Sequence, residues 1–169
     1  ERGRTDRRVQ FSMGVVQRRA GRSIGRQEPL LKLYLASVSP RRRQLLRTLG
    51  VKFSVLSPRY EEKNGKEKTP VQFVKKHALG KALSVANKIR EGRILSADSI
   101  VYCRGRILGK PKDRKEAISM MNLVQGKWQT IYTGVALLEI LKGRVVRKKV
   151  FVEKTSLKLK KLSQKEIYL

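Results

Sequence analysis

The residue with the clearest chemical potential is Asp98, a carboxylate inside the apolar stretch ILSADSIVY. Burying a carboxylate in such a strand is costly unless it is paired with a cation or bound to a metal ion. Asp98 could position a divalent metal ion or accept a proton from a water molecule. The alternative interpretation is an aspartate at the end of a strand that only caps a turn.

A second candidate is the basic segment SVSPRRR, Ser37 to Arg43. Ser39 occupies an N-cap position and Pro40 the first helical position, which is typical of a helix start. The first turn of a helix presents unpaired N–H groups and the positive end of the helix dipole, so arginines there are unfavourable unless they hold an anion. The segment therefore predicts a polyphosphate site, and the alternative is an exposed basic turn.

Three further charged side chains are weaker candidates. Glu62, in a polar loop, could be a second metal ligand or a solvated loop residue. Lys81, on an apolar-striped helix, and Lys110, held extended before a proline, could each meet phosphate oxygens as a point charge. Composition alone cannot select two lysines from 41 basic residues. His77 is the only histidine, and a structural role is favoured over catalysis.

The order of the elements that must position these residues predicts an α/β protein with a mixed sheet. Apolar runs predict strands, and cap residues with apolar stripes predict helices. Trp128 is expected to pack near the start of a long late hairpin. The expected strands span 30–37, 51–57, 93–109 with a turn at 104–105, and 130–159 with a turn at 142–143. The expected helices span 40–49, 70–91 and 114–124, and a capping box opens a last one at Ser163.

Composition excludes several classes of protein. The chain has 169 residues, of which 40% are hydrophobic, so it suits one folded domain. Cys103 is the single cysteine, which rules out an intrachain disulfide and a cysteine-rich zinc site. No apolar run approaches the roughly 18 residues that cross a bilayer. We therefore expect a cytoplasmic protein with no membrane partner.

The formal net charge of +28 is the strongest bulk signal. Such a charge attracts polyanions and supports non-specific nucleic-acid binding. A solvated basic surface without a functional meaning is the alternative. Residues 1–29 hold eight arginines and no lysine, and we expect a disordered basic extension there. A basic arm that binds nucleic acid is the other interpretation of that segment.

Five separated blocks together are more specific than any one residue. They are LASVSPRRRQLL, EE before a helix that contains Lys81-Ala82, ADSIV, GRILGKPKD and TGVALL. In this order and at these distances they resemble the Maf family of nucleoside triphosphate pyrophosphatases. The resemblance covers residues 30–169. It implies an α/β fold in which a mixed, twisted sheet is flanked by helices, similar to the inosine triphosphate pyrophosphatases.

The resemblance also implies roles for individual residues. Asp98 matches the catalytic aspartate, taken as the proton acceptor, and Glu62 matches an acidic residue near the metal. The implied reaction is attack of water on the α-phosphorus, which gives a nucleoside monophosphate and pyrophosphate. Mg²⁺ or Mn²⁺, held by Glu62 and Asp98, would offset the charge of the phosphates. The positions that match substrate-binding residues are Ser37, Arg41, Arg42, Lys81 and Lys110.

Two positions bear on the base that the family member accepts. Arg41 agrees with the subgroup that hydrolyses dTTP and UTP, in which an arginine follows the Ser-Pro pair. Ser99 stands where that subgroup has threonine, and it keeps the hydroxyl. Gln129 stands where many members have histidine. A pyrophosphatase specific for 7-methyl-GTP is the alternative within the family.

Members of the family continue into a segment similar to DKAGAYGIQG, which residues 157–169 do not contain. From the resemblance we therefore expect a domain over 30–169 that lacks its C-terminal segment. If the 169 residues are the whole protein, we expect a base pocket that is open on one side, reduced stability and weak activity. The rival hypothesis is a basic nucleic-acid-binding protein that kept the fold and lost catalysis. The expected partner is a nucleoside triphosphate, and a homodimer is an open alternative to a monomer.

Overall fold

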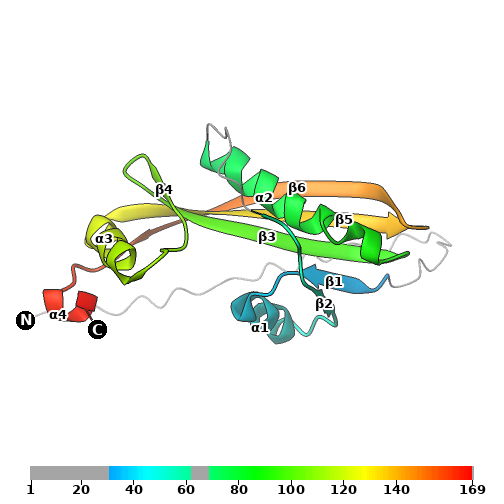
Figure 1. The fold of residues 1–169 in the computed structure, drawn as a ribbon, viewed down its shortest axis with the longest axis horizontal. Coiled ribbons are helices and arrows are strands. Elements are labelled where there is room, and N and C mark those ends of the chain that lie inside the picture. The colour runs from blue at the N-terminus through cyan, green and yellow to red at the C-terminus, as the bar shows by residue number, and fades with distance from the viewer. Residues whose placement is uncertain (1–30, 62–68, 169) are drawn as a thin grey trace, which may run out of the picture.

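The strands form one six-stranded mixed sheet (Figure 1). The computed structural model describes residues 31–61 and 69–168. The strand order is β2-β1-β3-β5-β6, and β4 pairs with β3 outside this path. β1 is parallel to β2 and β3, whereas β3, β5 and β6 are antiparallel neighbours. The strands are β1 (Leu33–Ala36), β2 (Ser54–Leu56), β3 (Gly92–Cys103), β4 (Arg106–Leu108), β5 (Trp128–Leu141) and β6 (Arg144–Lys158).

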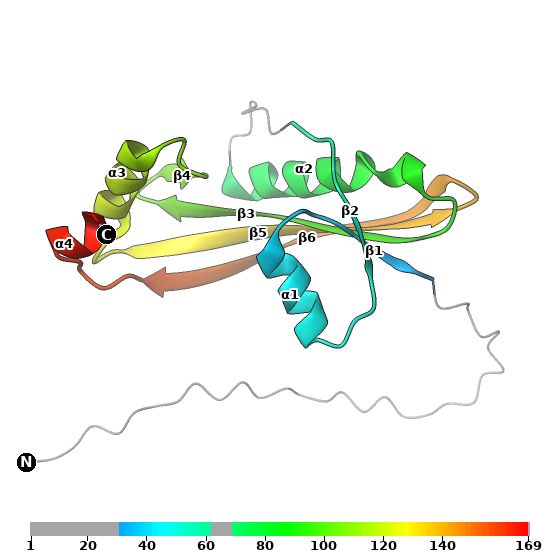
Figure 2. The same cartoon turned by 60° about the horizontal axis from the view of Figure 1, so that its bottom comes forward.

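Helices flank the sheet, as the sequence predicts. The longest, α2, packs on β3 and β5 along one face, and α1 lies on the other side of the sheet beside β1 (Figure 2). The expected fold class, a mixed sheet flanked by helices, is therefore confirmed. The helices of the described ranges are α1 (Pro40–Thr48), α2 (Pro70–Leu83), the short 3-10 helix η1 (Ala86–Lys88), α3 (Arg114–Val124) and α4 (Gln164–Tyr168).

The core lies between α2 and the sheet. Apolar residues of α2 recur every three or four positions, so they share one face of the helix. Val74, Ala78 and Ala82 on that face are completely buried. They pack against strand residues that alternate toward α2, among them Ile94 and Leu138. The packing of this one helix therefore fixes which face of β3 is covered.

Gly134 of β5 lies where the backbone of α2 comes closest to the sheet. A Cβ at this position would lie 2.2 Å from the carbonyl oxygen of Val74 and 2.5 Å from its carbonyl carbon. Backbone atoms cannot yield as the end of a flexible side chain can. We therefore expect Gly134→Ala to lower the free energy of unfolding by about 3 kcal/mol, because α2 must move off the sheet. Urea unfolding followed by circular dichroism measures the change.

Gly109 provides the matched control. A Cβ there would meet no atom within 4 Å, so Gly109→Ala should change the free energy of unfolding by less than about 0.5 kcal/mol. An unfolding midpoint of Gly134→Ala equal to that of Gly109→Ala would show that α2 and β5 are not in the close contact described.

Both expected hairpin turns are present. Arg104 and Gly105 join β3 to β4 with φ of 48° and 77°. Lys142 and Gly143 join β5 to β6 with φ of 50° and 75°. Two successive left-handed residues are the signature of the tight turn that matches the twist of a hairpin. The two predicted turns are thus confirmed.

The expected helix caps are also present. Asp113 accepts a hydrogen bond from the N–H of Glu116 at 2.7 Å and caps α3. At α4, the Ser163 hydroxyl accepts from the N–H of Glu166, and the Glu166 carboxylate accepts from the N–H of Ser163. The ammonium of Lys160 and the donors of Ser163 lower the pKa of Glu166 to about 2. The capping box predicted at Ser163 is confirmed.

Two expectations are wrong in detail. The second helix ends at Leu83 instead of reaching residue 91, because the backbone leaves the helical conformation at Val85 and continues as the short helix η1. Trp128 begins β5 as expected, but its surface is 68% exposed, so it does not pack into the core.

Some predictions are not addressed by this part of the structure. The expected disordered extension, residues 1–29, and Glu62 lie outside the described residues. None of the helices in the two described ranges is long and apolar enough to cross a membrane.

Candidate active site

Asp98 and Lys81 form an ion pair beneath α2. The Lys81 ammonium lies 2.6 Å from Asp98 Oδ1, and the two side chains are 13% and 7% exposed. Asp98 is in the middle of β3, which excludes the interpretation of a turn cap at a strand end. A carboxylate in this apolar strand is expected to need a partner, and the partner is Lys81. Oδ2 of Asp98 has no hydrogen-bond partner within the described ranges, and it is left to take a proton or to meet a cation.

Two contacts place Lys81 within reach of Asp98. The Ser96 hydroxyl donates to the carbonyl of Ala78 at 2.5 Å and ties α2 to β3 two residues before Asp98. Gly134, which pairs with Asp98 across the strands, admits the helix backbone because it has no side chain. Sequence reasoning missed both residues, because the bond of Ser96 depends on how α2 packs and only the strand register brings Gly134 beside Asp98.

The first turn of α1 is organised around Ser37. The buried Ser37 hydroxyl accepts from the N–H of Ser39 at 3.2 Å and from the Arg42 guanidinium at 3.4 Å. Ser39 is the N-cap residue by backbone position, but its own side chain makes no capping bond. The structure therefore brings Ser37 and Arg42 together at the end of β1, as the phosphate-site prediction requires.

Arg41 lies elsewhere on α1. It is exposed, whereas Arg42 is half-buried. Arg41 helps to line an open hollow of about 460 Å³ beside α1. The hollow includes neither Ser37 nor Asp98; its lining residues are Pro40, Arg41, Arg43, Gln44 and Arg47.

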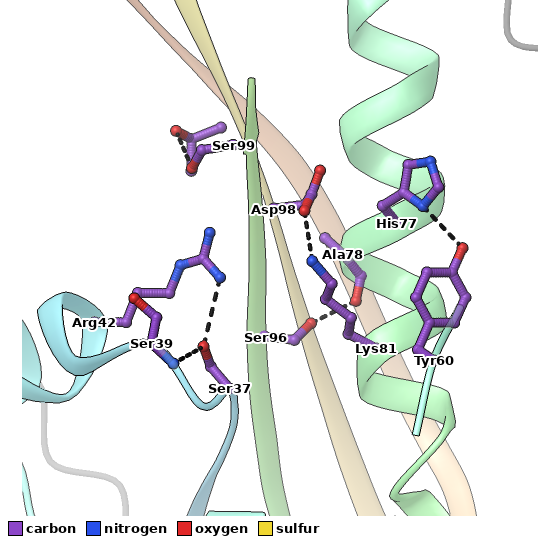
Figure 3. Close-up of polar contacts among 11 residues, drawn as sticks. Ser37, Ser39, Arg42, Tyr60, His77, Ala78, Lys81, Ser96, Asp98 and Ser99 are labelled. Carbon is purple, nitrogen blue, oxygen red and sulfur yellow. Dashed lines mark hydrogen bonds and ion pairs between the residues drawn. The ribbon is translucent and has the colours of Figure 1, made fainter. Parts of the chain in front are cut away.

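The site residues divide between the two faces of β3 (Figure 3). Asp98 and Lys81 lie on the side of α2, and Ser37 and Arg42 lie on the other side with Ser99. This division follows from the strand period of two, because Asp98 and Ser99 are consecutive. The Ser99 hydroxyl is 3.0 Å from that of Thr133, its cross-strand partner. Thr133 is a polar contact that sequence reasoning missed.

An unpaired length of strand edge separates the two groups. β1 pairs with β3 at residues 93–95, and β4 pairs with β3 at residues 101–103. Both lie on the edge opposite β5, since residues 101–102 pair with β4 and β5 at once. Residues 96–100 therefore have no strand partner on this edge within the described chain. A ligand at this edge could reach groups on both faces of β3.

The remaining predicted residues are not assembled here. Lys110 is exposed in the loop after β4, and no described residue forms an ion pair with it. Gln129 is buried at the start of β5, and its side-chain nitrogen has no hydrogen-bond partner among the residues described. His77 is fully buried, and its Nδ1 is 3.1 Å from the Tyr60 hydroxyl, which fits the expected structural role.

Comparison with known proteins identifies the family. The family model described as Maf-like protein matches residues 32–168. The chain belongs to this family. A protein named dTTP/UTP pyrophosphatase from Elusimicrobium minutum is 44% identical over 141 residues, which cover 82% of this chain and 73% of that protein. Another of the same name from Thermosipho melanesiensis is 43% identical over 137 residues, covering 81% and 70%.

Solved structures match this Maf-like chain more distantly. A nucleoside-triphosphatase described as a dITP/XTP pyrophosphatase, from Mycobacterium abscessus, aligns with a TM-score of 0.45 and 16% identity. The alignment covers 75% of this chain and 72% of that one. Membership of the family therefore rests on the sequence match.

Proposed function

We propose that this Maf-like protein hydrolyses dTTP and UTP to the nucleoside monophosphate and pyrophosphate. The observation that carries the proposal is the buried Asp98–Lys81 pair at the unpaired edge of β3. A carboxylate there can accept a proton from an attacking water molecule, and an ammonium beside it can meet the phosphates. The substrate class follows the names of relatives that are more than 40% identical.

The two faces of β3 suggest how the substrate lies. Asp98 would act on water near the α-phosphorus on the side of α2. Ser37 and Arg42 at the first turn of α1 would hold phosphate oxygens through a hydroxyl, a guanidinium and helix N–H groups. The hydroxyls of Ser99 and Thr133 lie on the same face as Arg42 and could meet the base or the sugar. Lys110 stays a predicted phosphate contact from the loop after β4.

The donor set of the described residues fits a divalent cation that the substrate helps to bind. Among the described residues no group of three His, Cys, Asp or Glu side chains could hold a metal by itself. Mg²⁺ characteristically binds through one or two carboxylates and the phosphates of a nucleotide. By the family resemblance, Glu62 and Asp98 are the proposed protein ligands of Mg²⁺ or Mn²⁺. The ion would offset charge on the phosphates, while Asp98 handles the proton.

Product analysis tests the reaction. The chain is incubated with Mg²⁺ and each of dTTP, UTP, ATP, GTP and 7-methyl-GTP, and the products are identified by chromatography. We expect monophosphate and pyrophosphate from dTTP and UTP. Release of orthophosphate would contradict the reaction. Preferred hydrolysis of 7-methyl-GTP would favour the other subgroup instead.

The neighbouring arginines of α1 should have separable roles. Arg42→Ala should lower kcat/KM for every nucleotide alike, by about tenfold or more, because a charge-assisted contact to phosphate is lost. Arg41→Ala should instead change the ratio of kcat/KM between UTP and 7-methyl-GTP, if Arg41 reads the base as the resemblance implies. Steady-state kinetics of both variants with both substrates make the comparison. An unchanged ratio in Arg41→Ala would remove the specificity role of Arg41.

The finer predictions on partners and location remain proposals. Non-specific nucleic-acid binding is the second candidate property, and the net charge of +28 supports it. A homodimer and a cytoplasmic location stay predictions from the sequence. Size-exclusion chromatography with light scattering measures the oligomeric state, and a dimer mass would support the first of them.

A further inference from the structure

The face of the sheet that carries Asp98 continues past α2 as a row of aromatic side chains. β3 and β5 both run on beyond the N-terminal end of α2 (Figure 2). Asp98 and Tyr102 share a face because they are four residues apart on β3. The rings of Tyr102 and Tyr132 meet edge to face at 6.0 Å, which places Tyr132 of β5 on the same face. Trp128, four residues before Tyr132, belongs to this face as well.

Lysines of β6 accompany these rings. The Lys154 ammonium lies 5.5 Å from the centre of the Tyr132 ring, and Lys158 pairs with Trp128 across the strands. The only acidic residue of β6, Glu153, points to the opposite face because it precedes Lys154 by one residue. None of the ion pairs within the described chain involves Lys154 or Lys158. This part of the sheet is therefore both aromatic and positively charged.

Edge strands often carry lysine to prevent pairing with other chains, which is a structural reason for the lysines of β6. That reason does not account for Trp128 beside them, whose surface is 68% exposed. A large apolar side chain that stays in water adds none of the stability that its burial would give. Rings that alternate with cations on an open sheet are instead the arrangement that single-stranded nucleic acids require. Their bases stack on aromatic faces and their phosphates meet lysines.

We propose that this aromatic platform binds single-stranded DNA or RNA without sequence preference. Four residues of strand separate Trp128 from Tyr132, which is roughly 13 Å and longer than one base can span. More than one stacked base therefore fits, which favours a polynucleotide over a single nucleotide. A duplex hides the faces of its bases, whereas a single strand presents them. The platform comprises Tyr102, Trp128, Tyr132, Lys154 and Lys158.

Trp128 is the only tryptophan of the chain, so its fluorescence reports on the platform directly. The full chain is titrated with oligothymidylate and, separately, with inorganic polyphosphate, which carries charge but no bases. We expect oligothymidylate to quench the fluorescence saturably and polyphosphate to bind without quenching. The apparent affinity for the oligonucleotide should fall as salt rises. Oligonucleotide binding that leaves the fluorescence unchanged would overturn the proposal.

The opposite face of the sheet supplies a matched control. Lys149 lies 5.9 Å from the ring of Phe151, which is itself 39% exposed, so a similar pair of side chains is available there. Tyr132→Leu should weaken oligonucleotide binding by about tenfold, while Tyr132→Phe should retain it. Phe151→Leu should leave the affinity unchanged. If Tyr132→Leu and Phe151→Leu lose the same oligonucleotide affinity, the binding would depend on overall charge, and the proposal of a platform would be wrong.

A mononucleotide distinguishes the platform from the proposed catalytic site. Uridine monophosphate should quench Trp128 only weakly, because it offers one base and few charges. If it competes with oligothymidylate at equal molar affinity, the rings would serve the base of a single nucleotide and the nucleic-acid proposal would be wrong. This result is independent of whether the chain hydrolyses dTTP, so the two proposals can fail separately.

Discussion

Replacement of Asp98 by asparagine should reduce the turnover of dTTP and UTP by at least about a hundredfold. The asparagine has nearly the same shape, and its carbonyl oxygen can still accept from Lys81, which lies 2.6 Å from Oδ1. It cannot take a proton from water and it carries no charge for a metal ion, so both roles proposed for Asp98 are lost while the shape of the side chain is kept. Pyrophosphate release at saturating substrate measures kcat, and circular dichroism with thermal unfolding monitors the fold.

Glu139 offers a control with the same chemical change. It is a strand carboxylate on β5 that lies 3.3 Å from the Arg93 guanidinium, on the face away from α2. Glu139→Gln should keep kcat near that of the wild type. Wild-type turnover by Asp98→Asn would remove the assignment of Asp98 as the base, and equal losses in both variants would point to a general effect of charge.

The local elements could be predicted because their signals are local. α3 begins after Asp113 and ends near Gly126, as a cap and a glycine indicate from neighbouring residues alone. The two hairpins could be placed by the glycines in their turns. The unpaired edge at residues 96–100 could not, because it depends on where β1 stops and β4 begins along β3. Such a register is set by long-range packing.

The candidate site shows the same limit. The need of Asp98 for a partner follows from its apolar surroundings. The identity of the partner does not, because Lys81 is 17 residues away and only the packing of α2 selects it from 41 basic residues. Arg41 and Arg42 differ by a rotation of about 100° around the helix, so their sequence positions alone do not say which one meets Ser37. The packing of α1 at the end of β1 decides it.

Replacement of Lys81 by methionine should lower the free energy of unfolding by about 3 kcal/mol. Methionine keeps much of the length and apolar surface of the lysine stem but leaves the Asp98 carboxylate, 7% exposed, without its cation. An uncompensated buried charge is costlier than the loss of the attraction alone. Urea unfolding of the variant at neutral pH measures this loss.

The double variant Lys81→Met with Asp98→Asn separates stability from chemistry. Asparagine beside methionine carries no charge, so the free energy of unfolding should recover to within about 1 kcal/mol of the wild type. Turnover should stay absent, because neither the base nor the cation is present. Full additivity of the two single losses would mean that the side chains do not interact in solution. Recovery of stability without turnover would instead show that Lys81 and Asp98 stabilise the fold as a pair, and that this stabilisation can be restored without restoring hydrolysis.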